Sequence, residues 1–205
     1  MSDTKQRILD TALTLFSQKG VSAVSLREIC GAVSIKESSV YYHFPNKQAI
    51  FDQLLTDFAE AANTKMAQLA QAVAGPWAPV GQDFYRPVCD AFFEGYLMDP
   101  FCNKVLRLLS IERAHSPTMA AQYDHWMFVL PLSFQQRVFD GLLERKAVRP
   151  GDSAHLALSY YAPIYLLAQR WLLAGPLTEE RKAAFRQAAC QHTALFFQER
   201  MGDAP

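Results

Sequence analysis

Residues 33–51 read VSIKESSVYYHFPNKQAIF, a polar stretch that runs into an aromatic cluster and then into a Pro-Asn-Lys turn. A buried helix would not place a lysine, a glutamate and two serines together at 36–39, because unpaired polar groups are costly to bury. An ordinary solvated helix would not continue with two tyrosines and a histidine at 41–43. The stretch therefore predicts a surface that contacts a partner.

Helical signals precede this stretch. Ile8, Ala12, Leu15 and Phe16 follow one another at i, i+4, i+7 and i+8, which predicts one apolar stripe on a helix. Gly20 is placed to end that helix, because glycine tolerates the left-handed conformation common at helix C-termini.

Two further short helices are predicted next. Ser25 is expected to cap the first, and Glu28 three residues later completes a capping box. The second covers roughly 36–43, and Asn46 is expected to cap a long helix that starts at Lys47. Two short helices with a tight linker, after a longer helix, are the pattern of a helix-turn-helix, whose second short helix reads DNA.

The residue types in this segment suit DNA. Serine and lysine donate to acceptors in the major groove, and glutamate accepts from cytosine. Lys47 and the free N–H groups of its helix are expected to converge on one phosphate. For Tyr41, core packing and phosphate contact both stay open. The candidate DNA-binding residues are Ser25, Arg27, Lys36, Glu37, Ser38, Ser39, Tyr41, Tyr42, His43 and Lys47.

The run SLREICGAVSIKESSVYYHFPNKQAIFDQLL (25–55) resembles the DNA-binding domain of the TetR/AcrR family of bacterial repressors. The resemblance covers roughly residues 5–58 and implies the same ten DNA-facing positions, together with a dimeric, ligand-controlled repressor. Two positions depart from the family pattern. Ser34 stands where glycine is common and is expected to need a positive φ. Lys36 stands where a capping serine is common.

Composition sets the wider limits. The 205 residues are 50% hydrophobic and 20% charged, with a formal net charge of zero, which excludes a globally basic nucleic-acid binder but not a locally basic face. No apolar run is long enough to predict a transmembrane helix, and the polar start MSDTKQRILD lacks a secretory signal. The four scattered cysteines show no CxxC spacing, so a cytoplasmic protein with reduced thiols is expected.

Beyond residue 80 the helical period continues, and turn signals separate the segments. Helices are predicted at roughly 81–98, 101–113, 117–145, 152–174 and 178–200. The expected fold is all-α with two domains. Residues 1–48 form the helix-turn-helix DNA-binding domain, and residues 49–205 form a larger helical domain for ligand binding and dimerisation.

This second region is rich in aromatic residues, most of which are expected to form core. The alternative for some of them is an apolar cavity that binds a small molecule. Arg107 is expected to be either an ion-pair partner or a ligand anchor. The candidate ligand-binding residues are Phe93, Tyr96, Arg107, Tyr123, Trp126, Leu130, Phe134 and Tyr161.

The last two predicted helices are apolar nearly all round or rich in alanine. They either close the core of the monomer or pair with a second copy as a four-helix interface, which the family resemblance implies. The candidate interface residues are Tyr165, Gln169, Leu173, Phe185, Ala188, Ala189, His192 and Phe196.

The predicted function is a ligand-responsive transcriptional repressor that releases a palindromic operator when a small apolar or aromatic molecule binds. The alternative is a small-molecule binding protein that has lost operator binding, which the departures at Ser34 and Lys36 favour. No enzyme is expected, because no nucleophile–base pair stands out, and no cofactor is implied. The histidines lack metal-ligand spacing, so no metal is expected.

Overall fold

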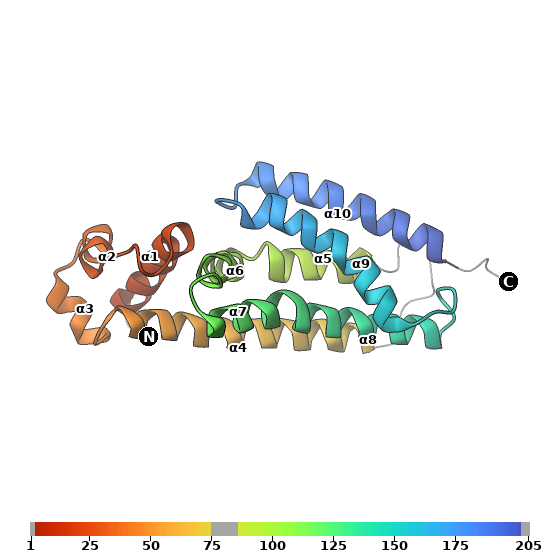
Figure 1. The fold of residues 1–205 in the computed structure, drawn as a ribbon, viewed down its shortest axis with the longest axis horizontal. Coiled ribbons are helices and arrows are strands. Elements are labelled where there is room, and N and C mark those ends of the chain that lie inside the picture. Colours follow the sequence, from red (N-terminus) through yellow and green to blue (C-terminus); the bar gives the residue numbers. More distant parts are fainter. Residues whose placement is uncertain (1–2, 75–85, 202–205) are drawn as a thin grey trace. The chain divides into compact units, whose positions relative to one another are not determined.

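The computed structural model describes residues 3–74 and 86–201, and every regular element in these two ranges is helical (Figure 1). The all-α class predicted from the helical period is therefore confirmed. Within the same ranges, none of the helices combines the length and the apolarity that crossing a bilayer requires.

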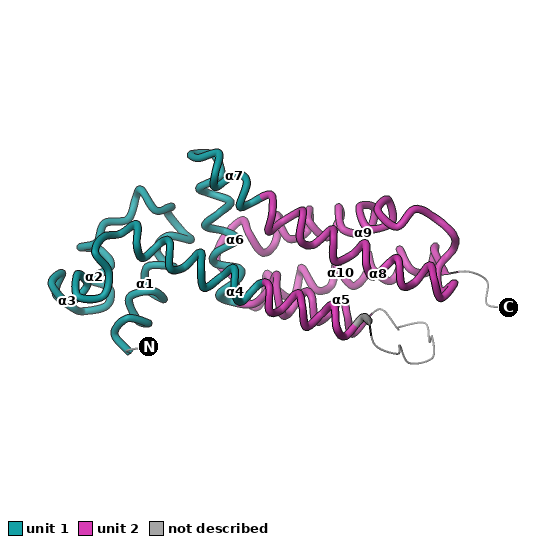
Figure 2. Tube along the Cα trace, turned by 90° about the horizontal axis from the view of Figure 1, so that it is seen from below, with its two compact units in different colours: residues 1–62, 100–123 teal, residues 63–99, 124–205 magenta. Residues whose placement is uncertain are grey.

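The chain divides into two compact units (Figure 2). The first consists of residues 1–62 and 100–123, and the second of residues 63–99 and 124–205. A segment from the middle of the sequence therefore belongs with the N-terminal helices. The predicted functional boundary between residues 48 and 49 is a different kind of division and stays a prediction.

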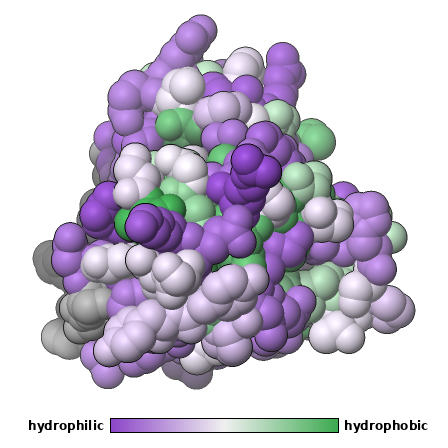
Figure 3. Space-filling model, turned by 90° about the vertical axis from the view of Figure 1, so that its left-hand side faces the viewer, coloured by the Kyte–Doolittle hydropathy of each residue, from purple (hydrophilic) through white to green (hydrophobic). Residues whose placement is uncertain are grey.

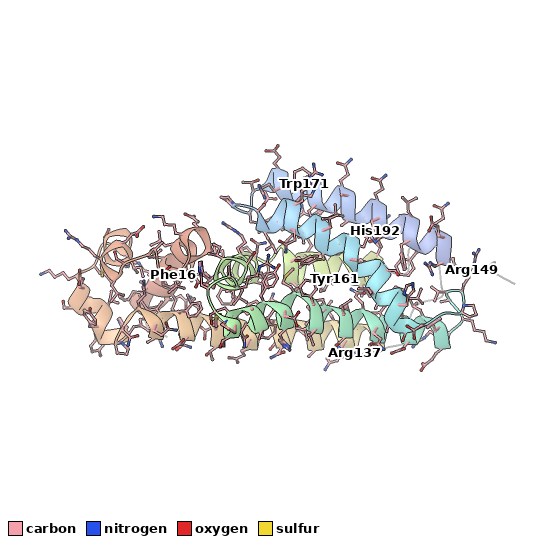
Figure 4. The ribbon with its side chains drawn as sticks, in the orientation of Figure 1. Phe16, Arg137, Arg149, Tyr161, Trp171 and His192 are labelled. Atoms are coloured by element: carbon pink, nitrogen blue, oxygen red, sulfur yellow. The ribbon has the colours of Figure 1, made fainter. Side chains whose placement is uncertain are left out.

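The first unit is built around α1, which packs against α2, α3 and α6. Phe16 of α1, labelled in Figure 4, is fully buried, as are Ile29 and Val40. Leu15, the remaining leucine of the predicted apolar stripe, is half-buried, and so is Leu26 of α2. The helices of this unit are α1 (Asp3–Lys19), α2 (Leu26–Val33), α3 (Glu37–His43), the first part of α4 (Lys47–Ala74), α6 (Pro100–Glu112) and most of α7 (Pro117–Asp124).

In the second unit, α8 packs on α9 and α9 on α10. The helices predicted at 117–145, 152–174 and 178–200 are all present. Residues 81–85 of the helix predicted at 81–98 lie outside the described residues. The elements of this unit are the last part of α4, α5 (Arg86–Phe92), η1 (Phe93–Leu97), η2 (His125–Val129), α8 (Leu130–Glu144), α9 (Ser153–Ala168), η3 (Gln169–Leu173) and α10 (Glu179–Arg200).

The three η elements are π-helical turns that continue α5, α7 and α9. Around η2, two buried tyrosines bind consecutive backbone carbonyls. The hydroxyl of Tyr96 donates to the Trp126 carbonyl at 2.7 Å, and that of Tyr161 donates to the Met127 carbonyl at 2.8 Å. A π turn disturbs the regular ladder of an α-helix, so these hydroxyls satisfy carbonyls that would be costly to bury unpaired.

Candidate nucleic-acid interface

The turn between α2 and α3 is set by its caps. The Ser25 hydroxyl accepts a hydrogen bond from the Glu28 N–H at 3.1 Å, as predicted. At the other end Ser34 adopts φ 62° and ψ 46°, and the Ile35 N–H donates to the Cys30 carbonyl at 3.0 Å. This is a Schellman ending, whose αL position glycine favours. The positive φ expected at Ser34 is therefore confirmed.

Helix α3 begins without a side-chain cap, because Lys36 at its N-cap makes no such hydrogen bond. The missing serine therefore leaves α3 without a capping side chain. The short helix is instead fixed by the fully buried Val40. From α1, the Arg7 guanidinium donates to the Val33 carbonyl at the end of α2, at 2.8 Å. Sequence analysis missed Arg7, because a contact across 26 residues leaves no local pattern.

The aromatic pair at the end of α3 lies at the surface. Tyr42 is 85% exposed and Tyr41 is 53% exposed, so neither is a core residue. Tyr41 is thus placed where a phosphate contact is sterically open. Of the ten predicted residues, Ser25, Arg27, Lys36, Glu37, Ser38, Tyr41 and Tyr42 are exposed, and Ser39, His43 and Lys47 are half-buried.

A shallow hollow of about 460 Å³ lies beside α3. Its lining is formed by Thr4, Ile35, Ser38, Ser39, Tyr42 and His43. Four of these were predicted, whereas Thr4 and Ile35 were not, since Thr4 stands at the start of α1, far away in sequence. Figure 3 shows the side on which α2 and α3 lie, and hydrophilic residues cover much of the surface in this view. Hydroxyl and imidazole groups around such a hollow can donate to anionic oxygens.

Lys47 contacts the backbone of the loop between α1 and α2. Its ammonium group donates to the Val21 and Val24 carbonyls, both at 2.6 Å. The predicted cap of α4 is present, since the Asn46 side chain accepts from the Ala49 N–H at 2.9 Å. The phosphate contact of Lys47 stays a prediction.

The predicted ligand-binding residues fall in both units. Arg107 and Tyr123 belong to the first and the others to the second. In the second unit the rings pack around Phe92, whose centroid lies 6.0 Å from that of Phe134, 5.7 Å from Tyr96 and 6.3 Å from Tyr161. Those buried are Phe93, Tyr96, Arg107, Tyr123, Trp126, Phe134 and Tyr161, while Leu130 is half-buried.

One edge of this aromatic core borders a surface hollow of about 450 Å³. Phe134 and Val138 supply apolar surface, and Arg137, labelled in Figure 4, stands among charged neighbours. The complete lining is Ala70, Phe134, Arg137, Val138, Asp140, Gly141, Glu144 and Arg145. An apolar surface with a charged rim suits a small amphiphilic molecule.

Three of the predicted dimer residues, Phe185, Ala189 and Phe196, are buried within their own unit. Half-buried are Tyr165, Gln169, Leu173, Ala188 and His192. His192, labelled in Figure 4, shares a hydrogen bond of 2.9 Å with the Tyr160 carbonyl. Large exposed apolar side chains lie on the same two helices, namely Leu158 (53%) and Leu166 (67%) of α9 and Leu195 (51%) of α10.

The thiols of the second unit are protonated at neutral pH. Burial raises the pKa of Cys89 to about 12, and its Sγ lies 3.0 Å from the Tyr160 hydroxyl. Partial desolvation, together with the nearby Asp90 carboxylate, also raises the pKa of Cys190. A raised pKa disfavours the thiolate that oxidants attack. Among the described residues, no three His, Cys, Asp or Glu side chains are arranged to hold a metal ion.

Known proteins resemble this chain at two levels. Residues 8–54 match the model of "Bacterial regulatory proteins, tetR family". The biofilm operon icaADBC HTH-type negative transcriptional regulator IcaR of Staphylococcus aureus is 47% identical over 49 residues, which are 24% of this chain and 26% of that protein. The chain thus matches about a quarter of the length of this curated relative.

Solved structures match over nearly the whole chain. A TetR-family transcriptional regulator from Agrobacterium tumefaciens superposes with a TM-score of 0.67 at 18% identity, over 97% of this chain and 98% of that one. The SmeT–triclosan complex gives 0.66 at 15% identity, over 99% of this chain and 94% of that one. At these identities the likeness concerns the fold. The N-terminal segment thus matches the tetR family of bacterial regulatory proteins, and the chain shares the fold of solved TetR-family regulators.

Proposed function

We propose that this protein is a DNA-binding transcriptional repressor whose recognition helix is α3. The exposure of Tyr42 carries this proposal. An aromatic side chain that is 85% exposed, beside the hydroxyl of Ser38 on a rigidly anchored helix, indicates a surface that a partner covers. Exposed Lys36, Glu37 and Ser38 offer donors and an acceptor to base edges. The hydroxyls of Tyr42 and Thr4 are suited to phosphate oxygens.

The alternative, a binding protein that has lost operator recognition, depended on the departures at Ser34 and Lys36. Both are accommodated locally. Ser34 takes the αL conformation and supports a Schellman ending, and α3 forms without a side-chain cap at Lys36. No observation in the described residues therefore favours loss of the motif.

The repressor acts as a homodimer in this proposal, since one short helix reads too few base pairs for useful specificity. The supporting observation is an apolar stripe. Leu158, Ala162 and Leu166 follow at i, i+4 and i+8 on the exposed side of α9, and exposed Leu195 lies on α10. Figure 1 shows α9 and α10 side by side. The interface then centres on these exposed residues, while the buried members of the predicted set support it from beneath.

Leu166→Glu tests the dimer. A charge within the stripe costs more to bury than the interface gains, so we expect a halved molar mass in sedimentation equilibrium. Gln136→Glu adds the same charge at an exposed position of α8 and leaves the mass unchanged. A Leu166→Glu protein of unchanged molar mass contradicts this interface.

The effector in this proposal is a small molecule with an apolar part that packs against Phe134, next to the hollow in the second unit. The SmeT–triclosan complex is a precedent for an aromatic ligand in a protein of the same fold. Such a ligand releases the operator by binding more tightly to a dimer whose recognition helices are spaced wrongly for DNA. The ligand needs only a higher affinity for this form of the dimer than for the form that binds DNA.

Selection of binding sites from random duplex DNA, at stated salt, tests the repressor itself. We expect the wild-type protein to enrich a palindromic site. Ser38→Ala is expected to relax the preference at particular positions, because it removes a group that faces base edges. Ser133→Ala, an exposed serine of α8, is the matched control and selects the wild-type site. Failure of the wild-type protein to enrich any sequence contradicts the proposal.

A further inference from the structure

The loop between α1 and α2 is held by two charged side chains of opposite sign. The N–H of Val21 donates to the carboxylate of Glu112 at 2.7 Å. The carbonyl of the same residue accepts from the Lys47 ammonium at 2.6 Å, and so does the Val24 carbonyl. Both backbone groups of Val21 therefore have a charged partner, one at the end of α6 and one at the start of α4. Hydrogen bonds to charged groups are stronger than neutral ones.

Contact between this loop and α6 is unusually close at Gly20. A Cβ atom there would lie 2.9 Å from Glu112 Oε1 and 3.1 Å from Ile111 Cγ2. The φ of +82° at Gly20 also disfavours any other residue. Glycine at position 20 therefore allows the loop to approach α6 closely enough for the Val21 N–H to reach the carboxylate.

Glu112 stands where a carboxylate is otherwise unfavourable. It is the last residue of α6, and the negative end of the helix dipole repels an acid at that place. Its bond to the Val21 N–H gives the acid a compensating partner. Elsewhere along α6, the Lys104 ammonium donates to the Thr14 hydroxyl of α1 at 2.9 Å, so α6 is attached to α1 as well as to the loop.

The loop leads directly into the DNA-facing helices. Val24 is buried and precedes Ser25, the N-cap of α2. A displaced loop therefore moves the start of α2, and with it the turn that carries α3.

We propose that Glu112 and Lys47 are positioning residues for operator binding. They clamp Val21 from both sides and thereby fix the place at which α2 begins. This inference rests on the repressor proposal. It also assigns Lys47 to the loop rather than to a phosphate, which the salt dependence of DNA binding distinguishes.

The first measurement needs no DNA. Amide hydrogen exchange of Val21, followed by NMR in the full-length protein, is expected to be about tenfold faster in Glu112→Ala, because the amide loses its acceptor. Glu112→Gln keeps an oxygen that accepts and restores the wild-type rate. Glu60→Ala, at an exposed position of α4, is the control and leaves Val21 unchanged. An unchanged rate in Glu112→Ala overturns the clamp.

The second measurement uses the duplex that the wild-type protein selects. Glu112→Ala and Lys47→Ala are expected to bind it about five- to tenfold more weakly, on the scale of typical coupling energies, with the same sequence preference. Their salt slopes stay at the wild-type value, because no phosphate contact is lost. Glu112→Gln is expected to bind within about twofold of wild type, by the same reasoning.

Three further results would also overturn the proposal, and each identifies a different part of it as wrong. A salt slope reduced by about one in Lys47→Ala places that lysine on a phosphate. Faster Val21 exchange in Glu112→Ala with unchanged affinity removes the positioning role and leaves the repressor intact. If the wild-type protein enriches no duplex, the repressor proposal fails and the positioning role falls with it, whatever the exchange of Val21 shows.

Discussion

The two units are stabilised by different means. In the first, short helices are fixed by backbone-directed bonds from Ser25, Arg7 and Lys47, and the polar groups of α3 are left at the surface. In the second, large rings pack on one another around Phe92, and two tyrosine hydroxyls donate hydrogen bonds to backbone carbonyls of η2. The two units therefore differ in which polar side chains remain accessible to a partner. Similar residue types stay exposed in the first unit and pack inward in the second.

The largest expected effect breaks the packing of the first unit. Phe16→Ala removes a fully buried ring and is expected to lower the free energy of unfolding by about 3–5 kcal/mol, from the lost burial and the cavity. Urea denaturation measures it. Gln18→Ala, at an exposed position of the same helix, is the control and is expected to change stability by about 0.5 kcal/mol or less. A loss under about 1 kcal/mol for Phe16→Ala contradicts the packing described.

A pair of tyrosine variants sharpens the comparison between the units. Tyr96→Phe leaves the buried Trp126 carbonyl without its donor and is expected to cost about 1–3 kcal/mol of stability. Tyr42→Phe removes a hydroxyl that is exposed, so it leaves the melting temperature unchanged and weakens binding to the selected duplex. Thermal unfolding and fluorescence anisotropy measure both variants. Equal effects on stability from the two substitutions are the outcome that contradicts this division.

A smaller effect is expected at the turn of the first unit. Ser34→Gly relieves a non-glycine residue at φ 62° and is expected to raise stability by about 0.5–1 kcal/mol. Ser38→Gly, inside α3, places glycine in a helix and is expected to lower stability by a similar amount. The opposite signs, read from urea midpoints, identify the αL requirement. A loss of stability in Ser34→Gly argues against it.

The smallest effect concerns an exposed ion pair in the second unit. The hydrogen bond from Arg186 holds the pKa of Glu94 below its usual range. A lowered carboxyl pKa contributes stability above the unfolded-state pKa, and that contribution disappears as the pH falls through the folded-state pKa. Arg186→Met is expected to cost less than about 1 kcal/mol at pH 7, since both groups are largely solvated, and to cost less at pH 3 than at pH 7. A larger loss at pH 3 than at pH 7 contradicts this sign.

Sequence alone predicted what is encoded locally. The caps at Ser25 and Asn46, the positive φ at Ser34 and the helix end at Gly20 each depend on a few neighbouring residues. It did not predict the clamp on Val21, because Glu112 lies 91 residues away. The π turns were not predicted either, because they interrupt the helical periodicity on which the prediction of helices depends. The sites proposed for ligand and dimer stay predictions, because an aromatic stripe looks the same whether it packs inward or binds a partner.

Hydrogen exchange with mass spectrometry, with and without the selected duplex, tests the central claim most directly. We expect DNA to slow exchange in peptides that cover Ser25–Lys47 and the start of α1 near Thr4. Peptides from α9 and α10 are expected to keep the exchange rates of the protein without DNA. Slower exchange confined to the second unit, or no change with the duplex in saturating excess, would contradict the claim that α3 and its hollow form the DNA-binding surface.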